Sequence, residues 1–346
     1  MPNLTHASCE LFERPPDERF ESTTDLLRHC QTLKERSRRL KEPGPEFRPV
    51  LHESDVALQV NGFSPCRLND WSFSQFCSIA GVAKDTVNRL RPETAVQVLS
   101  ETVRQRTRDD TDLQALVFDD KIIRAINGEQ YKRLWNAEII AMLQEFAVDF
   151  QPPQKGYNGA TGLYAGEQDM FCFLIDPAGW TEIGEDAFAP GFFVWNSEVG
   201  KRTVGVSTFW FQAVCANHVV WDACEVTEFT RKHTGRVRDA LTDIRAAIEA
   251  LVKRRDERKD RFAKVVAKAM ATTYGQDAEE VEKLLNKAGF TKSLTTRALE
   301  IAAEHGRFTV WSLVDAMTQL ARDLQYAGSR TEAEQKASSL LSLVTV

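Results

Sequence analysis

The run TVGVSTFWFQAVCANHVVW, residues 203–221, constrains the fold more than any other part of the sequence. Its side chains alternate with the period of two that is typical of a strand. One face carries Val204, Val206, Thr208, Trp210, Gln212 and Val214, and the other carries Ser207, Phe209 and Phe211. Because both faces are largely apolar, we expect a strand in the centre of a sheet, with one face under helices.

Further strand patterns precede this run. The segments MFCFLID (170–176) and GFFVWNSEVG (191–200) are apolar, and residues 56–61 alternate between apolar and other side chains. Leu113–Phe118 and Ile122–Ile126 flank a turn that begins with two aspartates, which predicts a hairpin. Together these segments predict a central, mostly antiparallel sheet from about residues 56–61 and 113–221.

The pattern becomes helical after residue 225. Val237, Ile244, Ile248 and Leu251 recur at helical spacings, and the rest of the chain shows helical patterns only. The sequence therefore predicts an α+β fold with an all-helical C-terminal part. We divide it into a polar, partly disordered N-terminal arm (1–50), an α+β core domain (51–224) and a helical C-terminal region packed on the core (225–346).

The stretch FSQFCSIAGVAKDTVNRL, residues 73–90, has the spacing of a helix-turn-helix. Gly81 stands where a chain leaves a helix in the left-handed conformation, and Val87 faces the core from a second short helix. As a DNA reader, that second helix would present five side chains to a groove, namely Lys84, Asp85, Thr86, Asn88 and Arg89. The alternative is a pair of core helices joined by a short turn, which the family resemblance given below favours.

Charge and cysteine content exclude several classes of protein. The net charge is −6, so any nucleic-acid contact must be a local basic patch and not the whole surface. The seven cysteines are scattered without a CxxC pair, which indicates reduced thiols and not a disulfide scaffold. Cys215, His218 and Cys224 lack the paired spacing of a structural zinc site, and we predict neither a metal nor a cofactor.

Targeting signals are not evident in the sequence. The first residues have no basic and apolar regions of a signal peptide, and the apolar runs are too short to cross a bilayer. We therefore expect a cytoplasmic protein without a membrane partner.

Four stretches together resemble the phage/plasmid-like protein family known as domain of unknown function 932. They are FSQFCSIAGVAKDTVNRLRPETAVQVL, RAINGEQYKRLWNAEI, NSEVGKRTVGVSTFWFQAVCANHVVW and TVWSLVDAMTQLAR. The matching positions in the second and third stretches are Arg124, Tyr131, Asn136, Asn196, Ser197, Glu198, Gly200, Cys215 and Asn217. In the fourth stretch the family has Asn where this chain has Asp315, so no role is carried over to that side chain.

The resemblance spans roughly residues 55–335. It implies a protein of phages, plasmids or integrated elements in a bacterial host cell. It also implies that the helix pair at residues 73–90 lies in the body of a domain, next to the sheet. It implies no established activity.

Basic side chains supply the candidate binding site. Residues 225–270 contain 13 Lys and Arg against 8 Asp and Glu, a local charge of +5. The candidate phosphate-binding residues are Lys201 and Arg202 at an expected hairpin tip, followed along the chain by Arg231, Lys232, Arg236 and Arg238. The candidate exposed aromatic residues for base stacking are Tyr157 and Trp195. We therefore expect a non-enzymatic protein that binds single-stranded or branched DNA during recombination or replication.

Two alternatives stay open. The acidic net charge would suit a protein-interaction factor of a mobile element, in anti-defence or assembly, and self-association is also left open. A metal-dependent nuclease would need several converging carboxylates. The candidates are Asp169, Asp176, Glu182, Glu185, Asp186 and Glu198, but the sequence contains no GxSxG, HExxH or Walker motif.

Overall fold

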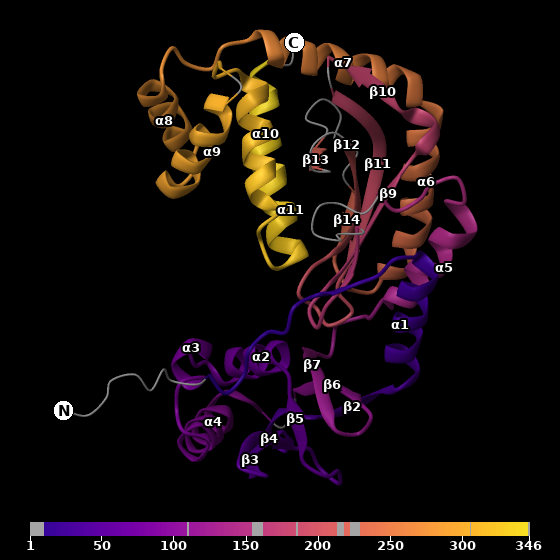
Figure 1. Cartoon of the computed structure of the whole chain (residues 1–346). Coiled ribbons are helices and arrows are strands. Elements are labelled where there is room, and N and C mark those ends of the chain that lie inside the picture. Colours follow the sequence, from indigo (N-terminus) through magenta and orange to yellow (C-terminus); the bar gives the residue numbers. More distant parts are fainter. Residues whose placement is uncertain are drawn as a thin grey trace, which may run out of the picture.

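The computed structural model describes residues 10–108, 111–153, 162–184, 186–212, 218–221, 229–304 and 306–344. The predicted α+β class is confirmed, and so is the helical C-terminal part. The strands form two sheets and not one central sheet. We call them sheet A and sheet B, and each forms a lobe with its own helices (Figure 1).

Lobe B contains the six-stranded sheet B, in the order β2-β6-β7-β5-β4-β3. All of its pairings are antiparallel except the parallel pair β5 and β7. Its strands are β2 (Ser37–Pro43), β3 (Arg48–His52), β4 (Asp55–Gln59), β5 (Cys66–Leu68), β6 (Asp112–Phe118) and β7 (Ile122–Gly128). Its helices α2 (Asp70–Ala80), α3 (Lys84–Val87) and α4 (Pro92–Arg106) bury their apolar sides on the sheet.

Lobe A contains the eight-stranded antiparallel sheet A, in the order β1-β8-β9-β11-β12-β13, with β10 paired to β11 and β14 to β12. Its long strands twist along the height of the lobe in Figure 1. They are β1 (Glu18–Arg19), β8 (Leu163–Ala165), β9 (Met170–Ile175), β10 (Thr181–Ile183), β11 (Asp186–Asn196), β12 (Val204–Gln212), β13 (His218–Trp221) and β14 (Phe229–Arg231).

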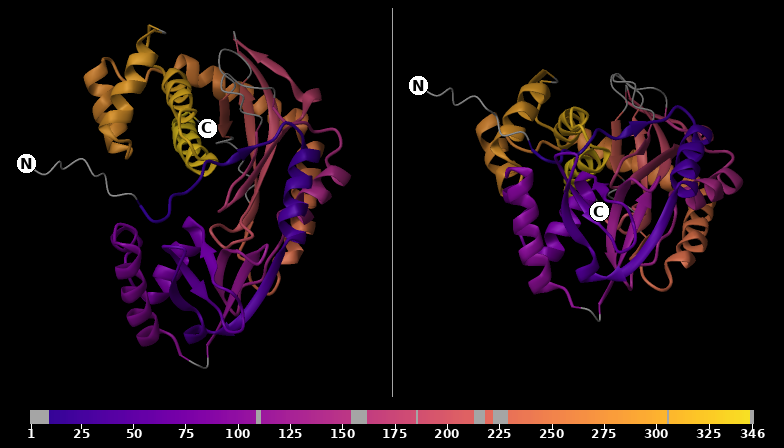
Figure 2. Two further views of the ribbon diagram at one scale, coloured as in Figure 1. Left: turned by 60° about the horizontal axis from the view of Figure 1, so that its bottom comes forward. Right: turned by 90° about the horizontal axis from the view of Figure 1, so that it is seen from below.

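Helices cover both faces of sheet A, as expected for strands that are apolar on both sides. Residues of α1 (Thr23–Glu35), α5 (Asn136–Phe146) and α6 (Ala240–Lys253) pack on one face. The helical C-terminal part reaches the other face, and Figures 1 and 2 show α10 and α11 on that side. Its helices are α7 (Arg255–Ala271), α8 (Ala278–Lys287), α9 (Lys292–Glu304), α10 (Val310–Ala321) and α11 (Ala327–Ser338). Short 3-10 turns lie at η1 (Gly44–Glu46), η2 (Pro177–Gly179), η3 (Val237–Asp239) and η4 (Ser339–Leu343).

The predicted N-terminal arm is wrong for residues 10–50, which form ordered elements. They include α1 and the edge strand β2, and the proposed boundary at residue 50 lies inside β3. Residues 10–20, which we call the N-terminal strap, cross from lobe B to lobe A (Figure 1). Phe12 stacks on Phe73 of α2 at 4.3 Å, and β1 pairs with β8.

The helix pair at residues 73–90 is part of the core, as the family resemblance favoured. α3 has only one turn, and Val87 is its buried residue. The Asn88 side chain is buried and exchanges hydrogen bonds with the Phe12 backbone, both at 2.8 Å. Lys84 forms an ion pair with the buried Asp70. Of the five side chains proposed to enter a groove, Lys84 and Asn88 are therefore engaged inside the protein, whereas Asp85, Thr86 and Arg89 are exposed.

Candidate functional site

The family-motif residues converge between the two lobes. Arg124 lies on β7 of lobe B, Asn136 begins α5, and Asn196–Gly200 form the turn after β11 of lobe A. We call this buried network the interlobe joint. Residues that contact each other directly in this network are 60 to 74 positions apart in the sequence.

Glu198 is the centre of the interlobe joint. Its side chain is 2% exposed, and its Oε1 accepts a hydrogen bond from Arg124 Nη2 at 2.7 Å. Its Oε2 accepts from the backbone N–H of Asn136 at 3.1 Å, and its backbone carbonyl accepts from Arg133 Nε at 2.6 Å. Both carboxylate oxygens are therefore used to hold β7 and α5 against the turn.

The neighbours of Glu198 bind mainly backbone groups. Asn196 Nδ2 donates to Leu134 O at 3.0 Å and to Asn136 Oδ1 at 2.7 Å. Tyr131 Oη donates to the carbonyl of Ser197 at 2.9 Å. The carbonyl of Val199 accepts from Trp71 Nε1, Gln75 Nε2 and Asn127 Nδ2 at 3.1, 3.1 and 3.2 Å. Asn196 Oδ1 is buried without a hydrogen-bond partner in the described structure, and the hydrogen bonds of the other groups fix the geometry of the network.

Two arginines and one glutamate are buried in the interlobe joint. Arg124 and Arg133 are each 7% exposed, so the joint holds one positive charge more than Glu198 neutralises. Burial lowers the pKa of Arg133 to about 10, which leaves its guanidinium charged at neutral pH. The guanidinium carbon lies 5.6 Å from the ring centre of Tyr131 and 5.5 Å from that of Trp135, and Asn127 Oδ1 accepts from it at 3.3 Å.

Four exposed cations gather beside this excess charge. We call Lys132, Lys232, Arg236 and Arg238 the cationic surface. The backbone N–H of Lys132 donates to the carbonyl of His233 at 3.0 Å, which places two distant chain segments side by side. Within the described part of the chain, no ion pair involves any of the four side chains.

His233 connects the cationic surface to the joint. Its ring stacks on Tyr131 at 5.2 Å, and its Nδ1 donates to the carbonyl of Lys132 at 3.2 Å. Burial lowers the pKa of His233 to about 4, so the ring is neutral at neutral pH. Its role is therefore to position the loop and not to add charge.

The basic residues predicted to bind phosphate lie in different environments in the structure. Lys232, Arg236 and Arg238 are all exposed in the segment between β14 and α6, which is part of the cationic surface. Lys201 and Arg202 do lie in the turn between β11 and β12, but Arg202 forms ion pairs with Asp169 and Glu332 at 2.7 and 2.9 Å. Lys201 is exposed and lies 5.0 Å from the ring centre of Trp71. Arg231 is paired with Asp239 and Asp243.

The predicted aromatic residues do not act as exposed stacking platforms in this structure. Trp195 is 8% exposed and stacks on Phe193 at 4.8 Å, so the expectation that it faces solvent is wrong. Strand alternation turns it toward the helices of the C-terminal part. Tyr157, Cys215, Asn217, Glu185 and Cys224 lie outside the described residues, as does the side chain of His218.

The carboxylates proposed for a nuclease are separately engaged. Asp169 pairs with Arg202, Asp176 with Arg255 at 2.5 Å, and Glu198 with Arg124. Asp186 accepts from Gln212 Nε2 at 2.9 Å on β12, and Glu182 is exposed on β10. Over the described ranges, no three His, Cys, Asp or Glu side chains converge as metal ligands.

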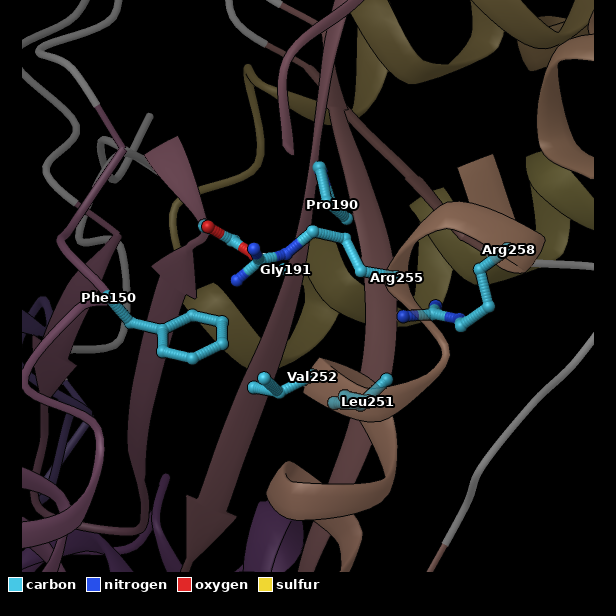
Figure 3. A pocket seen from close by; sticks show the side chains of 8 residues that line it. Phe150, Pro190, Gly191, Leu251, Val252, Arg255 and Arg258 are labelled. Atoms are coloured by element: carbon cyan, nitrogen blue, oxygen red, sulfur yellow. The ribbon is translucent and has the colours of Figure 1, made fainter. Parts of the chain in front are cut away.

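A pocket lies between α6, α7 and sheet A, and Figure 3 shows its lining side chains. Arg255 forms an ion pair with Asp176, which also lines the pocket. Figure 3 shows the Arg255 side chain beside Pro190 and Gly191 of β11. The free volume is about 10 Å³, which holds about one water molecule. The pocket is therefore too small for a substrate.

A model of the family described as Domain of unknown function (DUF932) matches residues 125–341. The chain therefore belongs to this family. The match includes Tyr131, Asn136 and the turn 196–200 and starts one residue after Arg124, and the stretch at residues 73–99 lies outside it. No curated protein and no solved structure matches the chain. No helix of the described residues is long and apolar enough to span a membrane.

Sequence reasoning missed several members of the site. Lys132 and Arg133 follow Tyr131 directly in the second resembling stretch, and Trp135 follows them. A basic pair between two aromatic residues was the available signal. Asn127 and His233 had no such signal, because only the fold brings them to the interlobe joint.

Proposed function

We propose that this DUF932 protein binds single-stranded nucleic acid at the cationic surface, without catalysing a reaction on it. The observation that carries the proposal is the gathering of Lys132, Lys232, Arg236 and Arg238 in a chain whose net charge is −6. Exposed cations that have no carboxylate partner among the described residues repel one another, so their clustering favours a role in binding an anion. The setting in phages, plasmids or integrated elements is part of the proposal.

Electrostatics supports a chain of phosphates as the ligand. The buried excess charge of Arg124 and Arg133 over Glu198 adds to the potential of the cationic surface. The backbone carbonyl of Glu198 and the side chain of Asn127 hold the Arg133 guanidinium in place. Its positive charge therefore contributes a constant term to the electrostatic potential at the cationic surface. Phosphates bound by such charges release condensed counterions, which makes the affinity depend on salt.

Aromatic side chains support a single strand in preference to a duplex. Tyr131 and Trp135 are partly exposed and flank the Arg133 guanidinium beside the cationic surface. They replace Trp195 as candidates for base stacking. A duplex keeps its bases stacked on each other, whereas an unpaired base can stack on a protein ring.

Fluorescence anisotropy with labelled single-stranded and duplex oligonucleotides tests the proposal. We expect the double variant Lys232→Glu/Arg236→Glu to weaken single-strand binding by about 100-fold, since two phosphate contacts become two repulsions. Trp135→Ala should weaken binding by about 10-fold, equivalent to the loss of one stacked base.

The matched control is Lys264→Glu/Lys268→Glu, which makes the same charge change on exposed positions of α7. It should leave the affinity within about twofold of the wild type, because the Debye length at physiological salt is only about 8 Å. If both double variants lost the same affinity for single strands, the loss would be explained by net charge alone, which would contradict a local binding site. Binding of duplex as tightly as single strands would contradict the stacking role.

The described surface gives no matching support for a protein partner. The exposed large apolar side chains that the structure describes lie on different elements and loops, and are Leu51, Ile122, Val148, Val252, Leu324 and Leu343. Singly exposed apolar residues are ordinary on a folded protein. We therefore keep nucleic-acid binding as the proposal.

A further inference from the structure

The two faces of sheet A differ in chemistry. The face under α1, α5 and α6 is mainly aliphatic. Its buried residues include Leu163, Met170, Leu174, Val194 and Val206, with Phe192 as a buried ring among them. The opposite face is aromatic, because the alternate positions of the same strands carry large rings. These rings are Tyr164, Phe171, Phe173, Phe193, Trp195, Phe209 and Phe211. We call this set the aromatic face.

The rings of the aromatic face form a continuous stack. Phe173 stacks on Phe193 at 5.0 Å with the planes 15° apart, and Phe193 stacks on Trp195 at 4.8 Å. Phe209 meets Phe173 edge to face at 5.6 Å. Rings stacked in this way cover each other's faces, so a further planar ring can extend the stack at its end or meet the ring edges edge to face.

The helix that packs on the aromatic face is polar. Ala327 of α11 is the helix residue in the described aromatic cluster, and Arg330 Nη1 donates to Tyr164 Oη at 3.4 Å. Arg330 and Glu334 form a buried ion pair at 2.9 Å on the same helix. The buried residues of α11 are Ala327, Gly328, Thr331, Glu334, Ala337 and Ser338. Such a helix removes little apolar area from water, so hydrophobic burial holds it weakly.

Ser207 places an unsatisfied hydroxyl on the same face. It lies opposite Phe193 in the pairing of β11 and β12, two residues before Phe209. Its side chain is 1% exposed, and its Oγ has no hydrogen-bond partner within the described structure. Buried polar groups are normally hydrogen-bonded, so an unpaired hydroxyl among rings indicates a missing partner.

Polar contacts from the N-terminal strap hold the start of α11. Asp17 Oδ2 accepts from the Ala327 N–H at 2.9 Å, and Tyr326 Oη donates to Arg14 O at 3.0 Å. Arg202, which shares Asp169 with Arg14 of the strap, pairs with Glu332 of the same helix. The far end of α11 is anchored differently, because Leu340 and Leu341 of η4 are buried in the apolar core of the C-terminal helices. The strap end is therefore the end that can open.

We propose that α11 is a lid over a binding site for planar nucleobases, which stack on the aromatic face and hydrogen-bond to Ser207. Opening of the lid also separates Glu332 from Arg202. Arg202 lies at the edge of the aromatic face, and its guanidinium carbon is 5.6 Å from the ring centre of Phe171. This site is separate from the cationic surface, which precedes α6 on the aliphatic side of the sheet. A nucleobase can come from a free nucleotide or from a single strand, and the experiment separates these sources.

Calorimetry with adenosine monophosphate and with an oligodeoxyadenylate of about eight nucleotides measures the site. The oligonucleotide arm uses the Lys232→Gln/Arg236→Gln background, so that the cationic surface contributes little. Ser207→Ala should weaken nucleobase binding by about fivefold, as expected for one lost hydrogen bond. Binding of the mononucleotide would identify a free nucleotide as the ligand of this site. Binding of the oligonucleotide but not the mononucleotide would identify the ligand as a base within a single strand.

Thr295→Val is the matched control for Ser207→Ala. Thr295 Oγ1 in α9 is also buried without a partner, but it belongs to the core of the C-terminal helices. Its substitution should leave nucleobase binding unchanged. Equal effects of Ser207→Ala and Thr295→Val, or no binding of either probe, would overturn the proposal even if the cationic surface binds DNA.

The lid is tested by Asp17→Ala, with Tyr326→Phe as a milder variant that removes one hydrogen bond. Both should speed hydrogen exchange of the α11 amides by about tenfold and strengthen nucleobase binding by about threefold, because the open state becomes more populated. Amides of α10, whose Val310, Leu313 and Val314 are deeply buried, should not change. Exchange of α11 only through global unfolding would overturn the lid.

Discussion

At the scale of single residues, Glu198 is the carboxylate at the centre of the buried interlobe joint. Glu198→Gln leaves Arg124 charged, buried and without its carboxylate partner. We expect a loss of about 3–5 kcal/mol in the free energy of unfolding, measured by urea denaturation. Glu279→Gln removes an exposed ion pair with Lys283 and should cost less than about 0.5 kcal/mol. A loss below about 1 kcal/mol for Glu198→Gln would show that the joint is not a buried charge network.

Gly200 offers a second test of the interlobe joint at the residue scale. Its φ is +92°, and an added Cβ would lie 2.8 Å from Asn127 Nδ2. Gly62 has a similar φ of +72° but open space around it. Gly200→Ala should therefore destabilise by about 2–4 kcal/mol and Gly62→Ala by only about 1 kcal/mol in thermal unfolding. Equal costs would mean that the Asn127 contact has no influence.

At the scale of elements, the loop after β8 meets the N-terminus of α2 through Glu167. Burial, together with the nearby Asp70 carboxylate, raises the pKa of Glu167 to about 7. The folded chain therefore keeps this proton up to about pH 7, whereas the unfolded chain releases it near the ordinary pKa of 4.5. The contribution of Glu167 to stability is full below pH 4.5 and is lost as the pH rises toward 7.

Glu167→Gln removes this titration. We expect the variant to be more stable than the wild type by about 1 kcal/mol at pH 8, after allowance for partial solvent access, with the difference vanishing near pH 4. Titration of His233 occurs in both proteins and cancels in the difference. Denaturation curves from pH 4 to 8 measure the difference. A constant difference across this range would contradict the assigned titration.

The strength of sequence-based prediction also differs between elements. Alternation predicted β9, β11 and β12, because a strand buried on both faces has few other interpretations. It did not predict that β6 and β7 belong to a second sheet, because alternation gives no information on strand partners. The N-terminal strap was missed because backbone hydrogen bonds and charged side chains hold much of it, and its polar, proline-containing composition resembles an unfolded segment.

The candidate site could be predicted only in part, because the sequence does not show which distant segments become neighbours in the fold. Lys232, Arg236 and Arg238 were recognised from their local charge, since they are close in sequence. Their partner Lys132 is a hundred residues away and becomes a neighbour only through the Lys132–His233 backbone hydrogen bond. Arg202 was misjudged because sequence gives no sign of the buried Asp169 that neutralises it.

At the scale of the whole molecule, the interlobe joint, the N-terminal strap and the cationic surface form one connected region. The joint fixes sheet A against sheet B, and the loop that leaves it, residues 131–135, carries Lys132 to the cationic surface. An acidic protein can bind nucleic acid when its cations are gathered locally in this way. The fold therefore accounts for a local binding region on a chain with a net charge of −6.

The salt dependence of single-strand affinity tests this account most directly. If the four side chains of the cationic surface each neutralise one phosphate, the slope of log affinity against log salt concentration should be about −2.8. Lys232→Gln/Arg236→Gln should reduce the slope to about −1.4, and Lys264→Gln/Lys268→Gln should leave it at about −2.8. A slope near zero in the wild type, or equal slopes in the two double variants, would contradict phosphate binding at this surface.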